Sequence, residues 1–186
     1  VIVSKAGEEF VGGKSVFDFS RSAIEESVEN SLRRLRTDRI EGVLLHSDGR
    51  DLDILENSGA MEALINCKAS GKILATGIST KTVAGGCKAI EMGLDMVMVT
   101  YNPWYRDEES VLDLAAERGE CSVLIKKGFG SGWFGTSGEE GPSECEDPVG
   151  RALKFIFSHP AATAVVSGTI NLSHLRQNAA AARTVR

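Results

Sequence analysis

Short apolar runs alternate with amphipathic segments along the whole chain. The apolar runs predict buried strands over 1–4, 42–45, 73–78, 96–101, 122–125 and 164–166. Segments with apolar residues at helical spacing predict helices over 20–35, 58–70, 82–92, 107–118 and 148–157, and a last helix from Asn171 or Ser173. The chain is therefore predicted to contain six strands, each followed by a helix.

Residues at the predicted helix ends agree with these boundaries. Ser20 is a favourable N-cap, and Pro148 is a favourable first helical residue because its ring fixes a helical φ. Gly71, Gly93 and Gly119 follow predicted helices, where glycine readily adopts the left-handed conformation that ends a helix.

Alternation of apolar strands with amphipathic helices predicts an α/β fold with a parallel sheet that is covered on both faces. A doubly wound sheet and a (β/α)8 TIM barrel both fit this pattern. Six strand–helix units are two fewer than a closed barrel needs. The pattern of the strands alone does not distinguish a doubly wound sheet from a barrel.

Composition limits the possible functions. The 186 residues carry a net charge of −5, which argues against nucleic acid as the main partner. The sequence shows no stretch of membrane-spanning length, no secretory signal and no C-x-x-C pair, so we expect a cytoplasmic protein with free thiols and no metal site. We expect residues 1–186 to form a single domain, with 133–147 as a mobile loop rich in glycine and glutamate.

Two of the predicted strands end in a polar residue that can take part in catalysis. Lys5 follows the first apolar run and His46 follows the second, with a helix between them. The carboxyl ends of parallel strands meet on one rim, where α/β barrels carry their active sites. A lysine or histidine at such a position is often only solvated, but the pair across one unit favours a shared site.

At several strand ends and helix starts the chain resembles the aldo-keto reductase family. The resemblance is carried by six segments in the family's order: Ser31–Asp38, Gly42–His46, Gly71–Thr80, Val99–Asn102, Val166–Thr169 and Leu175–Asn178. It implies an eight-stranded α/β barrel, of which this chain supplies strands three to eight. The family reduces aldehydes or ketones to alcohols with NADP(H) or, alternatively, NAD(H).

The resemblance assigns catalytic roles to two residues and leaves two positions unfilled. Lys5 matches a lysine that lowers the pKa of a catalytic tyrosine, and His46 matches a histidine that binds and orients the substrate carbonyl. The family's aspartate and tyrosine belong to the first two strands, which this sequence does not contain. The N-terminal part of the barrel is therefore expected to be missing.

The resemblance also implies a set of cofactor-binding residues. Ser79 and Thr80 match the carboxamide site, Met98 stands where a glutamine is usual, and Lys126 stands where an aromatic ring usually stacks on the nicotinamide. A lysine there favours the reduced cofactor, because the oxidised ring is positively charged. Residues 128–132 match the pyrophosphate loop, and the cofactor residues expected in and beside it are Lys127, Phe129 and Ser131.

The adenosine end of the cofactor is matched by Gly168, Thr169, His174 and Asn178. His174 stands where the family has an arginine that clamps the 2′-phosphate. Histidine is mostly neutral near pH 7, which makes the preference for NADP(H) weaker than usual. A plain helix start is the alternative interpretation of this segment.

These observations give one leading hypothesis and two alternatives. The leading one is an NAD(P)H-dependent carbonyl reductase that takes a small carbonyl or alcohol substrate in a pocket walled by Trp104, Tyr105 and Trp133. The alternatives are a nucleotide-binding relative without catalysis, and an unrelated barrel enzyme acting on a phosphorylated ligand. The sequence leaves the oligomeric state open.

Overall fold

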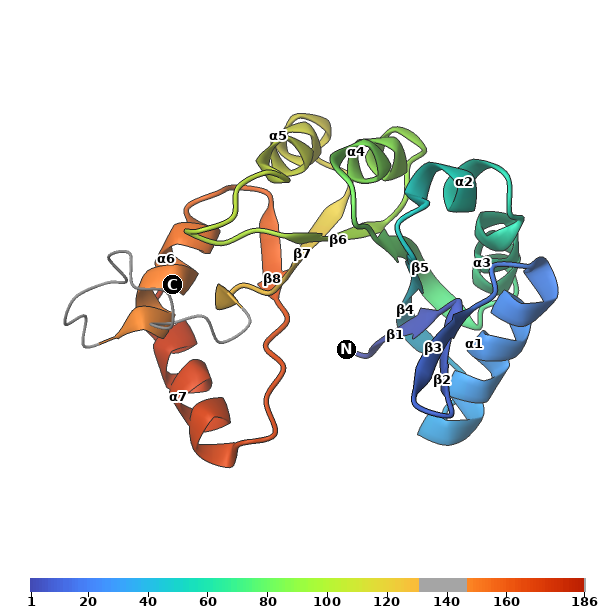
Figure 1. The fold of residues 1–186 in the computed structure, drawn as a ribbon, viewed down its shortest axis with the longest axis horizontal. Helices are drawn as coiled ribbons and strands as arrows, with labels where there is room; N and C mark the ends of the chain where they lie inside the picture. Colours follow the sequence, from blue (N-terminus) through green and yellow to red (C-terminus); the bar gives the residue numbers. More distant parts are fainter. Residues whose placement is uncertain (131–146, 186) are drawn as a thin grey trace.

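A computed structural model describes residues 1–130 and 147–185. Its centre is a six-stranded sheet in the order β1-β4-β5-β6-β7-β8, in which every neighbouring pair is parallel (Figure 1). The strands are β1 (Val3–Ala6), β4 (Ile40–His46), β5 (Ile73–Ser79), β6 (Met96–Thr100), β7 (Ser122–Lys126) and β8 (Ala162–Val165). The six predicted strands are confirmed, with bounds shifted by up to two residues.

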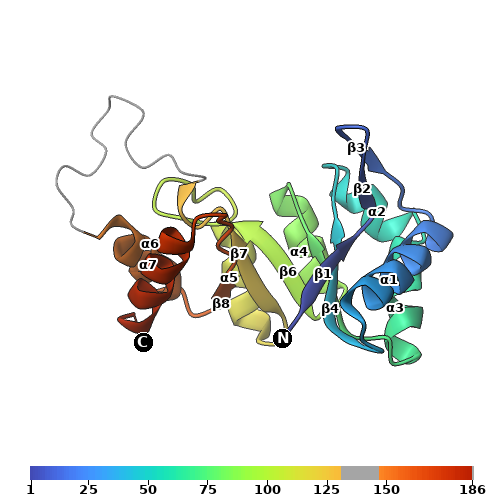
Figure 2. The same ribbon diagram turned by 90° about the horizontal axis from the view of Figure 1, so that it is seen from below.

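The helices lie along the outer side of the curved sheet (Figures 1 and 2). They are α1 (Arg21–Leu35), α2 (Asp51–Glu56), α3 (Ala60–Ala69), α4 (Val83–Glu91), α5 (Glu109–Arg118), α6 (Pro148–Phe157) and α7 (Leu172–Arg183). A doubly wound sheet has helices on both faces, so the arrangement excludes that alternative and favours a segment of a barrel.

The predicted helix boundaries are largely confirmed by the caps. The Ser20 side chain accepts a hydrogen bond from the Ala23 backbone N–H, and Pro148 occupies the first turn of α6. Gly119 ends α5 in the left-handed conformation. At the last helix, where two starts were open, the N-cap is Asn171, whose side chain accepts from the Ser173 backbone N–H at 2.9 Å. Local polar and glycine signals thus set the element lengths.

Three elements were missed by the sequence prediction. The antiparallel hairpin of β2 (Glu8–Val11) and β3 (Lys14–Phe17) lies between β1 and α1, and the short helix α2 lies between β4 and α3. Gly12 and Gly13 form the hairpin turn with φ of 58° and 83°, a combination that favours glycine. The hairpin stands beyond the carboxyl end of β1, away from the main sheet (Figure 2).

The two faces of the six-stranded sheet have different surroundings. The outer face and the helices share the main hydrophobic core, which includes Leu45, Ile78 and Val97. On the inner face of the described chain, a much smaller buried cluster consists of Leu44, Met96, Met98 and Leu124. Residues paired in register on parallel strands point to the same face, so the positions alternating with the outer core lie on this inner face.

Candidate active site

Several of the predicted site residues share the inner face of the sheet at its carboxyl end. His46 is in register with Ser79, Ser79 with Met98, and Thr100 with Lys126. Lys5 is in register with Leu44, two residues before His46 on the neighbouring strand. The predicted approach of Lys5 and His46 on one rim is therefore confirmed, while their catalytic roles remain predictions.

His46 contacts a carboxylate that the sequence analysis did not identify. Its Nδ1 lies against a carboxylate oxygen of Glu8, the first residue of β2. Burial lowers the pKa of His46, and the positive charges of Lys5, Lys126 and Lys81 act in the same direction, whereas Glu8 opposes them. A hydrogen bond from Ser15 lowers the pKa of Glu8, with a further contribution from His46.

Lys126 bridges the ends of two strands on this face. Its ammonium donates hydrogen bonds to the Ser79 hydroxyl at 3.4 Å and to the Thr80 carbonyl. Thr80 is itself buried, and its backbone N–H donates to the Met98 carbonyl at 3.1 Å. The four residues predicted for the nicotinamide end are therefore gathered in one place.

A buried carboxyl group, Glu108, lies close enough to Lys126 for the two charges to interact. Glu108 is 3% exposed, and one of its oxygens accepts from the Thr100 backbone N–H at 3.2 Å. Its other oxygen has no hydrogen-bond partner within the described part of the chain. Burial raises the pKa of Glu108 and lowers that of Lys126, while attraction between the two groups opposes both shifts.

A hydrogen bond joins the loops after β6 and β7 beside Lys126. The Asn102 side-chain amide donates to the Lys127 carbonyl at 3.0 Å. Lys127 has a φ of 53°, which is strained for a residue other than glycine. Phe129 packs partly against the cluster of Val149, Leu153 and Ala181. The predicted pyrophosphate loop thus starts with an unusual backbone turn, and Ser131 lies outside the described residues.

The residues predicted for the adenosine end surround the start of α7. Thr169 and His174 are exposed, as is Gly168. The Thr169 hydroxyl accepts a hydrogen bond from the Asn171 backbone N–H at 3.1 Å, and the Asn178 amide donates to the Ser167 hydroxyl at 2.7 Å. The segment between β8 and α7 is therefore held by local hydrogen bonds, with polar groups facing solvent.

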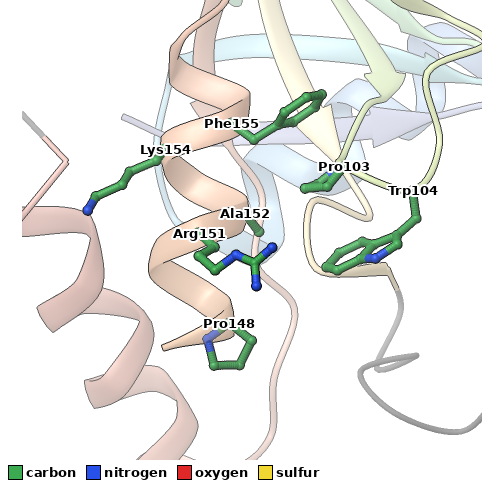
Figure 3. Close-up of a pocket in the computed structure, with 7 residues that line it drawn as sticks. All are labelled: Pro103, Trp104, Pro148, Arg151, Ala152, Lys154 and Phe155. Atoms are coloured by element: carbon green, nitrogen blue, oxygen red, sulfur yellow. The ribbon is translucent and has the colours of Figure 1, made fainter. Parts of the chain in front are cut away.

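One of the predicted substrate-pocket residues lines a cavity of about 350 Å³ (Figure 3). Trp104 and Pro103 face α6 across it, and the remaining lining residues come from α6: Pro148, Arg151, Ala152, Lys154 and Phe155. Tyr105 is not among them, and Trp133 lies outside the described residues. Lys5 and His46 do not line this cavity.

The two tyrosines of this chain follow the end of β6. Tyr101 belongs to the outer core, stacks on Phe155 and donates a hydrogen bond from its hydroxyl to the Glu109 carboxylate at 2.9 Å. Tyr105 forms the turn after β6 with Asn102. Burial raises the pKa of Tyr101 to about 12, which makes it a poor acid.

The described residues offer neither a metal-binding cluster nor a membrane-spanning helix. Within residues 1–130 and 147–185, histidine, cysteine, aspartate and glutamate side chains form no group of three or more that could hold a metal ion. Over the same ranges, the helices are too short or too polar to cross a membrane.

The fold and the rim define a protein of the parallel α/β-barrel class, with a lysine, a histidine and a second lysine at the carboxyl ends of its strands. The sequence model of the Aldo/keto reductase family matches residues 1–147. The chain belongs to the aldo/keto reductase family, which confirms the resemblance.

Similar proteins include two proteins of known structure and one reductase. A Pseudomonas aeruginosa protein classed as an aldo-keto reductase is 46% identical with a TM-score of 0.87, over 100% of this chain and 68% of its own. The holo form of aldo-keto reductase AKR11C1 from Bacillus halodurans is 26% identical with a TM-score of 0.75, over 97% of this chain and 66% of its own. The 6-dehydroglucose reductase of Agrobacterium fabrum is 26% identical, over 98% of this chain and 65% of its own.

The chain thus spans about two thirds of the length of these relatives. This proportion agrees with the six strands in the sheet, which correspond to strands three to eight of the eight-stranded barrel that the family resemblance implied.

Proposed function

We propose that the complete protein is an NAD(P)H-dependent oxidoreductase that interconverts small carbonyl compounds and alcohols. The observation that carries the proposal is the convergence of Lys5, His46, Ser79 and Lys126 on one face at one end of the sheet. Lysine and histidine there can bind and polarise a substrate oxygen. Family membership supports the same reaction class.

The residues present are compatible with a nicotinamide dinucleotide, which would supply or accept the hydride. At the nicotinamide end, the Lys126 ammonium is a donor for a carboxamide oxygen, and it already binds two oxygens at the end of β5, two strands away in the sheet. At the adenosine end, Thr169, His174 and the first backbone N–H groups of the 12-residue helix α7 suit a phosphate. The described chain thus offers donors for both ends of the cofactor.

A second candidate function is nucleotide binding without catalysis. It is favoured by one observation: Tyr101 belongs to the outer core and is hydrogen-bonded to Glu109, so it is not available to protonate a substrate bound beside His46. A tyrosine from the part of the barrel that precedes β1 in the relatives would remove this objection.

The test uses the full-length protein and both reduced nucleotides. We expect NADPH to bind at least as tightly as NADH in a fluorescence titration. We also expect consumption of NADPH, followed by absorbance, with a panel of aliphatic and aromatic aldehydes. Binding without turnover of any carbonyl or alcohol would support the second candidate, and failure to bind either nucleotide would contradict both.

The adenosine end is tested with a pair of variants on α7. His174→Ala removes a hydrogen-bond donor near the helix start and should weaken NADPH binding about fivefold, equivalent to about 1 kcal/mol, with little effect on NADH. The matched control is Arg183→Ala in the last turn of the same helix, which should change neither constant. Equal losses for both nucleotides would exclude a 2′-phosphate contact.

A further inference from the structure

A buried carboxyl group is anchored to the strand next to Lys126. Lys126 at the end of β7 is in register with Thr100 at the end of β6. The Thr100 backbone N–H donates a hydrogen bond to a carboxyl oxygen of Glu108 at 3.2 Å. Glu108 immediately precedes α5 and is 3% exposed. Its position is therefore fixed by β6, out of contact with solvent.

Hydrogen bonds compensate only part of the charge that Glu108 can carry. One oxygen is held by Thr100, and the other has no hydrogen-bond partner within residues 1–130 and 147–185. A buried carboxylate is costly unless an opposite charge lies near it. Among charged groups, Lys126 has the largest effect on the pKa of Glu108, and Glu108 has the largest effect on that of Lys126. The two side chains are therefore charge partners.

The other contacts of the Lys126 ammonium are with uncharged groups. It donates to the Ser79 hydroxyl at 3.4 Å and to the Thr80 carbonyl, which fix its position on the inner face at the end of β5. Neither acceptor carries a charge, so the positive charge of Lys126 is offset through space by Glu108. Any ligand beside the ammonium experiences both charges.

We propose that Glu108 is a positioning residue that acts through Lys126: its carboxylate offsets the ammonium, so that the site binds the cationic oxidised nicotinamide nearly as well as the neutral reduced form. The identity of the ligand rests on the proposed oxidoreductase function, whereas the pairing of the two side chains does not. The proposal modifies the expectation that Lys126 alone would favour the reduced cofactor. Comparable affinities for both forms suit an enzyme that works in either direction.

Other charged and titratable groups also face Lys126. Those that act on it, or that it acts on, come from α2, β1, the loop after β7 and β4: Asp51, Lys5, Lys127 and His46. Asp51 favours the ammonium, as Glu108 does, but its carboxylate accepts the Thr82 backbone N–H at 2.8 Å and the Thr82 hydroxyl. The carboxyl group with an unpaired oxygen is Glu108, which makes it the group to change.

The first test measures the dissociation constants of NADP⁺ and NADPH by calorimetry on the full-length protein at pH 7. Glu108→Gln keeps an oxygen that can accept from Thr100 and removes the charge. It should raise the dissociation constant of NADP⁺ about fivefold and change that of NADPH little. The matched control is Glu117→Gln, an exposed carboxylate on α5, which should change neither.

Variants of Lys126 test whether Glu108 acts through it. Lys126→Met should lower the ratio of the NADP⁺ to the NADPH dissociation constant, because the repelling charge is removed. Without the ammonium, burial should leave Glu108 protonated. Adding Glu108→Gln to Lys126→Met should therefore change the ratio much less than it does alone. If Glu108→Gln did not fold, an unchanged ratio in Lys126→Met would by itself overturn the inference.

The pH dependence of this ratio gives a signature that damage to the fold would not produce. The charged ammonium disfavours NADP⁺, so the ratio should fall as pH rises through the pKa of Lys126. Glu108 raises that pKa, so the fall should begin at a lower pH in Glu108→Gln. His46 is already neutral in the alkaline range, because burial and the nearby lysines lower its pKa.

Carbon-13 NMR of the lysine ε-carbons tests the pairing without any nucleotide. Lys126→Met identifies the Lys126 signal in the full-length protein. We expect this signal to titrate at a lower pH than those of exposed lysines, because burial lowers the pKa of Lys126. In Glu108→Gln it should titrate at a still lower pH, and Glu117→Gln should leave it unchanged.

The outcomes separate the inference from the proposed function. A Lys126 signal that titrates at the same pH with and without Glu108→Gln would overturn the inference, as would equal changes in the affinities for NADP⁺ and NADPH. A response of Lys126 to Glu108→Gln in a protein that binds neither nucleotide would uphold the pairing. That result would contradict the proposed function and the role of Glu108 toward the cofactor.

Discussion

The outer and inner faces of the same sheet are built differently, although they alternate residue by residue. On the outer face, Leu45 and Ile78 pack into a continuous core with the helices. On the inner face, the neighbouring Leu44 belongs to a small cluster, and the positions nearest the carboxyl end are polar, among them His46 and Lys126. The outer face therefore stabilises the fold, and the inner face supplies the chemistry.

The contrast shows how one strand can contribute both to the stabilising core and to the candidate active site. In β4, the period-two alternation sends Leu45 to the helices and Leu44 and His46 to the interior. The inner residues can change in character along the strand, from apolar to polar, without disturbing the outer core. Substitutions at adjacent positions should consequently have unequal effects on stability and function.

Leu45→Ala and Leu44→Ala should give the largest difference in stability between the two faces of the sheet, so they test the comparison most directly. Both leucines are fully buried on β4. We expect Leu45→Ala to lower the free energy of unfolding by about 4 kcal/mol, because the surrounding helices cannot close the cavity. Leu44→Ala should cost about 2 kcal/mol, since the flexible Met96 and Met98 can move into the space. Urea unfolding of both variants measures the difference, and equal losses would contradict the distinction between the faces.

Alanine substitutions at two glycines of the inner face should give the next largest effect on stability. A Cβ on Gly77 would lie 2.3 Å from the Met96 carbonyl oxygen and 2.6 Å from the Leu44 side chain. A Cβ on Gly42 would lie 2.3 Å from the end of the Met96 side chain, which can move aside. We expect Gly77→Ala to destabilise by about 3 kcal/mol and Gly42→Ala by about 1 kcal/mol.

Thermal and urea unfolding of the two glycine variants check this order. The pair also separates backbone crowding from the loss of chain flexibility, because alanine reduces the freedom of the unfolded chain equally at both positions. If Gly42→Ala were the more damaging change, the inner face would be less adaptable than its methionines suggest.

The sequence predicts the outer face better than the rim. Periodicity depends on apolar residues such as Ile24, Val28 and Leu32, which all turned out to be buried on α1. The hairpin was missed because most of its apolar residues, Phe10, Val11 and Val16, are exposed and follow no core pattern. Its signal was nevertheless present in the two glycines between short alternating runs.

The contacts of the rim depend on tertiary structure and could not be read from the sequence. The position of Lys126 at the end of β7 was predicted, but its bonds to Ser79 and Thr80 join segments 46 to 47 residues apart. Glu8 reaches His46 because β1 and β4 are neighbours in the sheet, so the chain that leaves β1 passes the end of β4. The sequence shows which residue types follow the strands. Their contact partners depend on which strand ends come together in the folded protein.

The smallest expected effect comes from Tyr101, which carries a hydroxyl group into the outer core. Tyr101→Phe removes the hydrogen bond to Glu109, so it should lower the free energy of unfolding by about 1 kcal/mol at pH 7. The pKa of Tyr101 is raised from 10.0 to about 12 in the folded state. Between these values the folded protein keeps a proton that the unfolded chain loses, so this residue's contribution to stability falls as pH rises.

The loss of unfolding free energy caused by Tyr101→Phe should therefore decrease between pH 9 and pH 11 and approach zero or change sign. The phenylalanine variant has no hydroxyl proton, so its stability lacks this dependence on pH. Urea unfolding at pH 7, 9 and 11 measures it, with Tyr105→Phe as the control: Tyr105 is 39% exposed in the neighbouring turn, and its replacement should change the pH dependence less. A cost that is the same at all three pH values would mean that Tyr101 ionises as easily in the folded protein as in the unfolded chain. The outer face would then admit water at this position, and its difference from the inner face would be smaller than the packing indicates.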